Sequence, residues 1–442
     1  MNMTPKEIVA YLDGYVIGQQ AAKKAIALAL RTRYRRMLLP AELQDEIMPK
    51  NILMIGSTGV GKTEISRRLA RMMGLPFIKV EASKYTEVGF VGRDVESMVR
   101  DLVMTSVSIV KEEEQEANRE AIEAYVIEKI VDKLLPPLPP LSGEAKKEEY
   151  ASSRARMRER VVSGDMDDRT IEIELPKMNL ELNDTNMPPE MAKMQESFSA
   201  MFSTLGKKDN RKEVTVREAK ELLKAEATDK LLDMDAIRTK ALQRAEQGGI
   251  IFLDEIDKIA VGSKSEGRND PSKEGVQRDL LPIVEGSAVT TKYGVIKTDH
   301  ILFIAAGAFH VSKPSDLIPE LQGRFPLRVE LESLDEEALY RILTETKNSL
   351  LRQYRALLSV ENVTLEFEDE AVRAIAALSH RANEKTEDIG ARRLHTVLEN
   401  VLEEISFQAD ESAGTTVTVT AAMVHERLDC VIEDEDLSRY IL

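Results

Sequence analysis

The sequence predicts an α/β fold in which a parallel sheet carries helices on both faces. Three observations predict it. A glycine-rich phosphate loop follows a short apolar strand, a second apolar strand ends in two carboxylates, and further strand-like segments alternate with helical sequence. Parallel strands need long crossover connections, usually helices, and such sheets are covered on both faces.

The bulk composition is that of an ordinary soluble globular protein. The 442 residues are 43% hydrophobic and 31% charged, enough for two to four domains. The net charge of −16 disfavours a dedicated nucleic-acid binder. A single cysteine excludes an internal disulfide framework, and neither a signal peptide nor an apolar run of about 18 residues is present. We therefore expect a cytoplasmic protein. The five histidines show no metal-binding spacing, so we expect no metal site built by protein ligands alone.

Two helices are expected before the first strand. Thr4-Pro5-Lys6-Glu7 reads as a capping box at the start of a helix over Pro5 to Leu12. A second helix runs from Gln20 to about Leu38 and ends in a run of arginines between 31 and 36. We interpret this run as a solvated helix face or a subunit contact, with phosphate or RNA binding as the alternative.

The central motif runs from 51 to 63. Asn51 to Ile55 is an apolar strand, and Gly56 to Thr63 (GSTGVGKT) fits the phosphate-loop pattern. Glycines let the backbone N–H groups converge on phosphate oxygens at the start of the next helix, which closes at Gly74. Lys62 supplies a cation for the β- and γ-phosphates, and the Thr63 hydroxyl can ligate Mg²⁺.

The next strand, Phe77 to Ala82, leads into a loop with two glycines around an apolar pair. This loop, Tyr85 to Gly92, presents Phe90-Val91 on flexible backbone. An apolar pair in such a loop favours a functional role, although a loop tucked against the protein is the simpler alternative.

Residues 104–245 read as an inserted, mainly helical domain, because a parallel crossover needs only about a dozen residues. Charged helical sequence over Lys111 to Glu128 is followed by Leu134 to Leu141 (LLPPLPPL), which must break any helix. Polar sequence of low hydrophobicity then extends to about Asp168, a composition typical of chain with little core. A methionine stripe over Met187 to Leu205 is interpreted as internal packing rather than a contact surface, and Val214 to Leu232 as an amphipathic helix.

The second diagnostic strand is Gly249 to Glu255. Its apolar run ends in Asp254 and Glu255, which fits a Walker B arrangement: Asp254 would hold the Mg²⁺ shell and Glu255 would activate the attacking water. An acidic surface turn is the alternative, but the presence of a phosphate loop in the same chain makes that alternative weak.

The remaining segments complete the sheet and add a C-terminal domain. Residues Gly262 to Gly275 read as a polar loop, and Ala288 to Thr298 as a hairpin. The last two of five strands are His300 to Ala306 and Leu327 to Leu331. The C-terminal domain is predicted as helices Leu334–Leu351, Ala371–His380 and Ile389–Phe407, with short strands at Val363–Phe367 and Thr416–Thr420.

The chain ends in an acidic stretch with an apolar tip. Leu437, Tyr440, Ile441 and Leu442 crowd apolar surface where no core is evident. Chain ends are usually frayed, but this end also suits insertion into a partner's groove.

Taken together, these motifs resemble AAA+ ATPases and, more closely, the HslU family, the unfoldase ATPases of the HslUV protease. The similar segments include VIGQ, GSTGVGKTE, EVGFVGRDVES, FLDEIDKI, GVQRDLLPIVEG, DLIPELQGRFP, IGARRLHTVLE and EDEDLSRYIL. The resemblance is weak only in the insert. It implies a nucleotide-binding domain over 1–103 and 246–332, an intermediate domain over 104–245, and a small α+β domain over 333–442 that carries a docking tail.

The resemblance also assigns roles to individual residues. It places Ile17 against the adenine and Arg324 as an arginine finger for the neighbouring subunit's nucleotide, with Glu320 near that site. Arg392 and Arg393 fall in the sensor-2 region. The phosphate wrap consists of Gly59, Val60, Gly61, Lys62, Thr63 and Glu64, and the pore loop of Gly89, Phe90, Val91 and Gly92. Two positions depart from the family pattern: Ala305-Ala306 stands where a polar sensor-1 residue is common, and Phe90 replaces the usual tyrosine.

Further implications of the resemblance are a homohexamer, MgATP as cofactor, the HslV peptidase as partner, and unfolded or tagged proteins as substrates, with no membrane or nucleic acid involved. The alternatives are a ClpX-like unfoldase, which the missing Cys-x-x-Cys module disfavours, and an AAA+ clamp loader or DNA motor. A non-hydrolysing adaptor is a third, disfavoured because Lys62, Asp254, Glu255 and Arg324 are all present.

Overall fold

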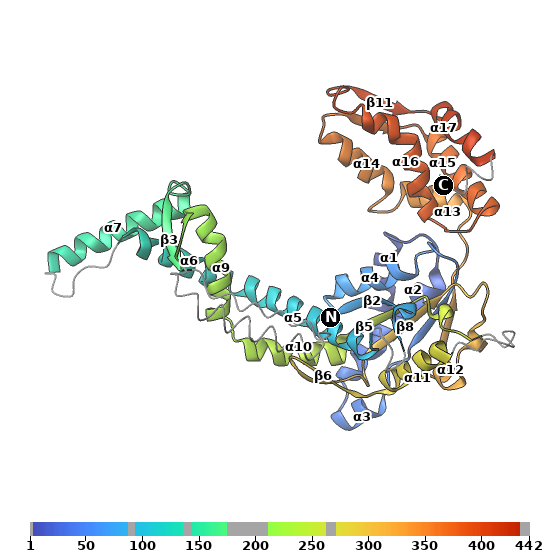
Figure 1. Cartoon of the computed structure of the whole chain (residues 1–442), viewed down its shortest axis with the longest axis horizontal. Helices are drawn as coiled ribbons and strands as arrows, with labels where there is room; N and C mark the ends of the chain where they lie inside the picture. The colour runs from blue at the N-terminus through green and yellow to red at the C-terminus, as the bar shows by residue number, and fades with distance from the viewer. Residues whose placement is uncertain (1–2, 87–92, 136–143, 175–210, 262–270, 434–442) are drawn as a thin grey trace. The chain divides into compact units, whose positions relative to one another are not determined.

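The computed structural model describes residues 3–86, 93–135, 144–174, 211–261 and 271–433. The chain divides into two compact units (Figure 1). One consists of Met1–Ile109 and Thr239–Leu442, and the other of Val110–Arg238. The second unit lies inside the predicted insert of 104–245. The division of the rest of the chain into a nucleotide-binding domain and a C-terminal domain stays a prediction.

A five-stranded parallel sheet forms the centre of the first unit, as predicted. The strand order is β2-β5-β8-β1-β9, so the strands next to the phosphate-loop strand come from much later in the sequence. The strands are β1 (Ile52–Ile55), β2 (Phe77–Glu81), β5 (Ile250–Asp254), β8 (Leu302–Gly307) and β9 (Leu327–Glu330).

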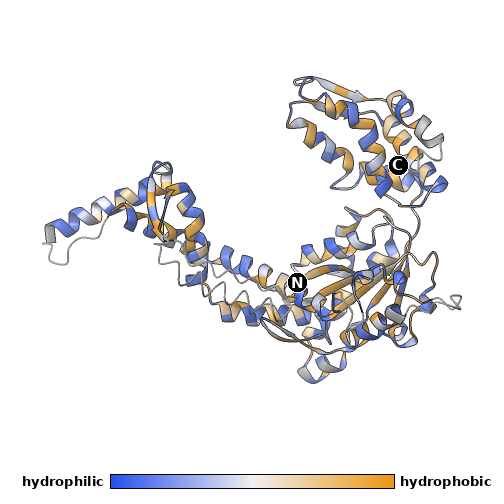
Figure 2. Cartoon of the chain, viewed as in Figure 1, coloured by the Kyte–Doolittle hydropathy of each residue, from blue (hydrophilic) through white to orange (hydrophobic). Residues whose placement is uncertain are grey.

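Burial explains the apolar runs of the central strands. Every residue of β8 is buried, as are the first four of β5 and the first three of β1. Figure 2 shows these strands as largely hydrophobic. The register pairs Ile55 with Gly307 and Leu253 with Ala305, so the carboxyl ends of β1, β5 and β8 share one edge of the sheet. The phosphate loop and the acidic pair therefore leave the sheet at that edge.

Helices flank the sheet, and α1 begins with the predicted capping box. The Thr4 backbone N–H donates to Glu7 Oε2 at 2.7 Å, and the Glu7 N–H donates to Thr4 Oγ1 at 3.3 Å. The other elements around the sheet are α2 (Gln20–Met37), α3 (Ala41–Glu46), α4 (Lys62–Met73), α5 (Glu96–Ala117), α10 (Met234–Gly248), α11 (Pro271–Glu285), the hairpin β6 (Ala288–Thr291) and β7 (Gly294–Lys297), and α12 (Pro319–Arg324); α1 spans Pro5–Asp13. The predicted polar loop of 262–275 is thus too long at its end, because α11 already begins at Pro271.

The interpretation of the arginine run as a solvated face is wrong for two of its members. Arg33 and Arg36 are buried. The Arg33 guanidinium donates to the carbonyls of Gln247 at 2.8 Å, Gly249 at 3.1 Å and His300 at 2.6 Å. Burial lowers the pKa of Arg33 to about 9. Gln247 lies at the C-terminal end of α10, where a helix leaves its carbonyls unpaired, and Gly249 and His300 lie near the starts of β5 and β8. Arg33 therefore fixes α10 to the start of the sheet.

The second unit is mainly helical and has its own apolar core. The polar stretch that reads as chain with little core forms α7 (Glu144–Ser163). Val161 is buried in this core, which gives α7 an anchor despite its polar composition. Its other elements are α6 (Arg119–Leu134), the antiparallel pair β3 (Thr170–Glu174) and β4 (Arg211–Thr215), and α9 (Val216–Leu231).

The C-terminal part of the first unit combines helices with a parallel two-stranded sheet, β10 (Thr364–Phe367) and β11 (Thr416–Val419). The single helix predicted over Leu334–Leu351 is in fact two, α13 (Glu336–Thr344) and α14 (Leu350–Ser359), and the Ser349 hydroxyl caps the second. The remaining helices are α15 (Asp369–Lys385), α16 (Arg392–Phe407) and α17 (Ala421–Glu433).

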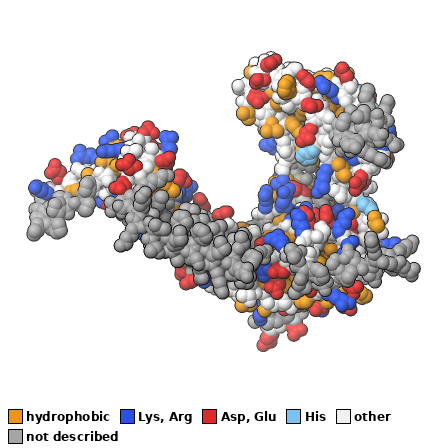
Figure 3. Space-filling view, viewed as in Figure 1, with side chains coloured by type: hydrophobic (Ala, Val, Ile, Leu, Met, Phe, Trp, Pro, Cys, Tyr) orange, Lys and Arg blue, Asp and Glu red, His pale blue; other side chains and the backbone are white. Residues whose placement is uncertain are grey.

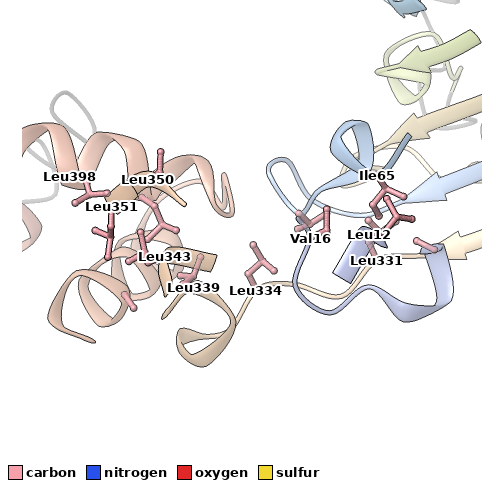
Figure 4. Close-up of a cluster of buried hydrophobic side chains, with 14 of the residues drawn as sticks. Leu12, Val16, Ile65, Leu331, Leu334, Leu339, Leu343, Leu350, Leu351 and Leu398 are labelled. Atoms are coloured by element: carbon pink, nitrogen blue, oxygen red, sulfur yellow. The ribbon is translucent and has the colours of Figure 1, made fainter. Parts of the chain in front are cut away.

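Buried apolar side chains of the C-terminal helices and of the helices beside the sheet belong to one core cluster (Figure 4). Leu339, Leu343 and Leu398 lie in the C-terminal helices, and Leu12 and Ile65 in the helices beside the sheet. Charged side chains of both signs are interspersed over the visible surface (Figure 3). Within the part of the chain that the structure describes, no helix is long and apolar enough to cross a bilayer.

Several predicted features fall outside the described residues: the pore loop Gly89 to Gly92, the methionine stripe over 187–205, and the tail with Leu437, Tyr440, Ile441 and Leu442. So do residues 136–141 of the predicted helix-breaking segment and residues 262–270 of the predicted polar loop.

Candidate active site

The phosphate loop joins β1 to α4 through glycines in conformations that other residues adopt only with strain. Gly59 has φ 78° and Gly61 has φ 102°. A Cβ on Gly59 would lie 2.0 Å from the carbonyl oxygen of Ile389, so no side chain fits there. Gly61 immediately precedes α4, and the loop therefore delivers its N–H groups to the positive end of that helix.

Lys62 is the first residue of α4 and is nearly buried. Its Nζ donates to the carbonyls of Gly56 at 2.5 Å and Ser57 at 2.7 Å. Burial lowers the pKa of Lys62, against the opposing attraction of Asp254 and Asp257. The ammonium thus lies folded over the loop, where phosphate oxygens can replace the two carbonyls as acceptors.

Glu64 lies two residues after Lys62, in the first turn of α4. Its carboxylate accepts hydrogen bonds from Arg67 and Arg68, the latter from Nε at 2.5 Å. Burial opposes ionisation of Glu64, but the bonds from Arg68 and Arg67 outweigh it and lower the pKa of the carboxyl group. In this structure the Glu64 side chain is held by α4 itself.

The acidic end of β5 carries Asp254 and Glu255. The Lys79 ammonium on β2 lies 2.7 Å from Asp254 Oδ2, and the Ser83 hydroxyl donates to Glu255 Oε2 at 3.3 Å. Glu255 has φ 57°, a left-handed conformation that a residue other than glycine adopts at a cost. Such strain is typical of functional positions.

The loop before α2 carries Ile17 and is fixed by buried polar side chains. The Lys23 ammonium donates to Asp13 Oδ1 at 2.6 Å and to the Val16 carbonyl at 2.5 Å. The Gln19 amide donates to the Glu332 carbonyl at 2.8 Å and accepts from the Glu332 N–H at 3.0 Å. The loop is therefore held from α2 and from the end of the sheet.

The two sensor-2 arginines have different surroundings. Arg392 lines the cleft, and its charge contributes to the lowered pKa of Lys62. Arg393 is buried and donates to Asn383 Oδ1 at 3.1 Å, Thr386 Oγ1 at 2.7 Å and the Glu387 carbonyl at 2.8 Å. Arg393 thus holds the loop whose Ala391 N–H donates to the Gly59 carbonyl at 3.2 Å.

The phosphate loop, the acidic end of β5, Ile17 and Arg392 line a cleft of about 1540 Å³. Pockets of roughly 300–1,000 Å³ hold drug-sized ligands, so a nucleoside triphosphate fits. The predicted residues that line it are Ile17, Gly59, Val60, Gly61, Lys62, Thr63, Glu64, Asp254, Glu255 and Arg392. Glu320 and Arg324, on α12, are absent from the described residues that line the cleft, and so is Arg393.

Thr63 and Asp254 are the donors that suit a magnesium ion. Both line the cleft, and both offer hard oxygen atoms, the ligand type that Mg²⁺ prefers. Within the described chain no cluster of three or more histidine, cysteine or acidic residues could hold a metal by itself. The donor set therefore fits an ion that arrives with phosphate oxygens and water in its shell.

Sequence reasoning missed Lys79, Ser83 and Lys23. Lys79 interrupts the apolar strand FIKVE, and Ser83 lies just after that strand, so both belong to the same sheet edge as Asp254 and could have been suspected. Lys23 had no signal, because a lysine within a helix is ordinarily solvated.

Two family models match the chain. Residues 52–135 match the ATPase family associated with various cellular activities (AAA), and residues 175–328 match the AAA domain of the Cdc48 subfamily. The matches include the phosphate loop and the acidic strand end described above.

Relatives match along the whole chain. The ATP-dependent protease ATPase subunit HslU of Helicobacter pylori strain Shi470 is 63% identical over 442 residues, which is 100% of this chain and 99% of the relative. The HslU subunit of Campylobacter jejuni strain NCTC 11168 is 62% identical, with both chains covered completely.

Proposed function

The chain belongs to the HslU family of ATP-dependent protease ATPase subunits, and from this premise we propose that it unfolds proteins for a partner peptidase. It is an ATPase of the AAA class, and it binds nucleotide. In the proposed assembly it forms a homohexameric cytoplasmic ring, translocates unfolded or tagged proteins, and delivers them to the HslV peptidase, which it also activates.

Different residues of the cleft bind different parts of the nucleotide. Ile17 packs against the adenine, and the N–H groups of Gly59 to Thr63 receive the phosphate oxygens. Lys62 exchanges its bonds to the Gly56 and Ser57 carbonyls for bonds to the β- and γ-phosphates. Because the loop is already folded around these positions, little conformational entropy is lost on binding.

Hydrolysis requires an activated water and stabilised phosphate charge. Glu255, whose backbone is left-handed, orients and deprotonates the water. Mg²⁺, held through Thr63 and Asp254, would neutralise charge on the phosphates. Lys79 then releases its bond to Asp254, and Arg392 contributes positive charge from the C-terminal part of the same chain.

Arg324 completes the site of the neighbouring subunit. It lies on α12, outside the residues that line its own cleft, and its side chain is 46% exposed. A trans-acting arginine is worth roughly 10³–10⁵ in rate, so a lone subunit hydrolyses ATP slowly. Head-to-tail contacts that close into a ring supply such an arginine to every site.

Substrate handling is assigned to two segments outside the described residues. Phe90 and Val91, between Gly89 and Gly92, grip the translocating chain, and Leu437, Tyr440, Ile441 and Leu442 dock into the peptidase. Phe90→Ala should retain ATPase activity and lose unfolding, and Phe90→Tyr should retain both. Deletion of Tyr440 to Leu442 should retain ATPase activity and lose peptidase activation.

The observation that carries this proposal is a single cleft in which the phosphate loop, the β5 carboxylates and Arg392 meet. We expect purified protein to drive casein degradation when both ATP and HslV are present. Glu255→Gln with HslV, and HslV alone, are the matched controls.

Degradation of casein that is equally fast without this protein would contradict the proposal. A rate of ATP hydrolysis that rises with DNA and not with casein would favour a DNA motor instead.

A further inference from the structure

Arg324 is held at two points by residues that lie outside the cleft. Its Nε donates to Glu285 Oε1 at 2.9 Å, and its Nη2 lies 2.7 Å from the same oxygen. Its backbone carbonyl accepts from Asn51 Nδ2 at 3.1 Å. Asn51 is itself fixed, because its Oδ1 accepts from the Phe303 N–H at 3.0 Å. The Arg324 backbone is thereby fixed relative to β1 and β8, and its guanidinium is fixed relative to α11.

Glu285 occupies an unfavourable place for a carboxylate. It is the last residue of α11, and negative charge at the C-terminal end of a helix opposes the helix dipole. A cation beside it offsets this cost, and Arg324 is that cation.

The pair is built to rearrange rather than to stabilise the fold. The two side chains are 38% and 46% exposed, and ion pairs this exposed contribute little to stability. A phosphate group, with more charge and more acceptor oxygens, competes well for the same guanidinium.

The contact also orients the guanidinium. Both interactions engage the edge formed by Nε and Nη2, so the direction of Nη1 is set by Glu285 together with the Asn51-anchored backbone. A free arginine side chain would have to lose most of its rotamer freedom on meeting a phosphate.

We propose that Glu285 is a positioning residue for Arg324, presenting the guanidinium to the nucleotide of the neighbouring subunit. This inference rests on the proposed function, because it assumes that Arg324 acts in trans. Glu285 touches neither the cleft nor the nucleotide in its own subunit, and it acts only through Arg324.

The kinetic test compares Glu285→Gln and Glu285→Ala with the control Glu274→Gln. Glu274 lies on the same helix and pairs with Arg278 at 2.6 Å, so the control removes an equivalent ion pair. Loss of preorganisation should lower kcat about threefold in Glu285→Gln, which keeps an acceptor oxygen, and about tenfold in Glu285→Ala. The KM for ATP and ring assembly should stay at wild-type values in all three variants.

A second readout follows the arginine itself. The full-length protein without nucleotide is treated with phenylglyoxal, and modification of each arginine is measured by mass spectrometry. Glu285→Gln should raise the modification rate of Arg324, because a neutral amide holds its two nitrogens less tightly than the carboxylate does, and leave Arg278 unchanged. Glu274→Gln should do the reverse.

A protein that already carries Arg324→Ala separates the positioning role of Glu285 from the trans role of Arg324. There, Glu285→Ala should cause no further loss of kcat. Wild-type hydrolysis in Arg324→Ala would defeat the trans role of Arg324. If Arg324→Ala hydrolyses ATP slowly while the Glu285 variants keep a wild-type or higher kcat, the positioning role alone is overturned. A loss of kcat from Glu285→Ala that persists in the Arg324→Ala protein would overturn it as well.

Discussion

The two halves of the catalytic machinery are built differently. Lys62, in the cleft, is 9% exposed and is bonded to two backbone carbonyls. Arg324, on α12, is 46% exposed at its side chain and is held by one carboxylate. The first is a buried side chain bonded to the backbone of its own loop, whereas the second lies at the surface in an exposed ion pair.

This difference follows from what each half must do. A residue that binds ligand in its own subunit gains from a rigid setting, because the ordering cost is met during folding. A residue that serves a neighbour has to remain accessible until the neighbour arrives. Until then, an ion pair that can exchange its acceptor orients the arginine side chain without fixing it permanently. Five substitutions test whether the two halves behave in these two ways.

The largest effect is expected from Lys62→Thr, which removes the main cation of the buried half. Binding of ATP should fall below detection in equilibrium dialysis, and hydrolysis should be lost with it. The fold should remain, since the Lys62 bonds are local to the loop. Retention of wild-type ATP affinity would show that the loop backbone suffices.

Arg324→Ala should bind ATP nearly normally and hydrolyse it roughly 10³–10⁵ times more slowly. The exposed half then fails without disturbing the buried half. Mixing this variant with Lys62→Thr subunits should restore some hydrolysis, because Arg324 of the latter completes the site of the former. Mixed rings, verified by mass spectrometry, that show no recovery would argue against action in trans.

Glu255→Gln should retain ATP and lose about 10²–10⁴ in turnover, because the phosphate ligands remain while water activation is lost. The readouts are ATP affinity and single-turnover hydrolysis. Turnover equal to that of the wild type would remove Glu255 from the role of general base.

The smallest change in activity is expected within the sensor-2 pair, where the structure separates two adjacent arginines. Arg393→Ala removes the hydrogen bonds that this buried side chain donates to Asn383, Thr386 and Glu387, and should lower the free energy of unfolding by about 2–4 kcal/mol. Arg392→Ala should weaken nucleotide binding and leave the melting temperature unchanged. Equal losses of stability in the two variants would contradict the assignment of Arg393 to a structural role.

Much of the fold could be predicted because its signals are local. The strand Gly249–Glu255 and the capping box of α1 depend on residues within a few positions of one another. The break between α13 and α14 was missed because leucines continue with helical spacing on both sides of it, while the Ser349 cap gives only a weak signal. The polar helix α7 was underestimated because its burial depends on a core assembled from distant segments.

The sequence by itself determined the strands of the central sheet and the chemical types at its active site, since the phosphate loop and the acidic strand end are contiguous motifs. Only the tertiary structure decided the strand order, the burial of Arg33, the separation of Arg392 from Arg393, and the pairing of Glu285 with Arg324. The physical reason is that these properties depend on contacts between segments far apart in the chain. Whether an arginine is solvated, structural or presented to a neighbour depends on which carbonyls and carboxylates the fold brings to it, and no local pattern carries that information.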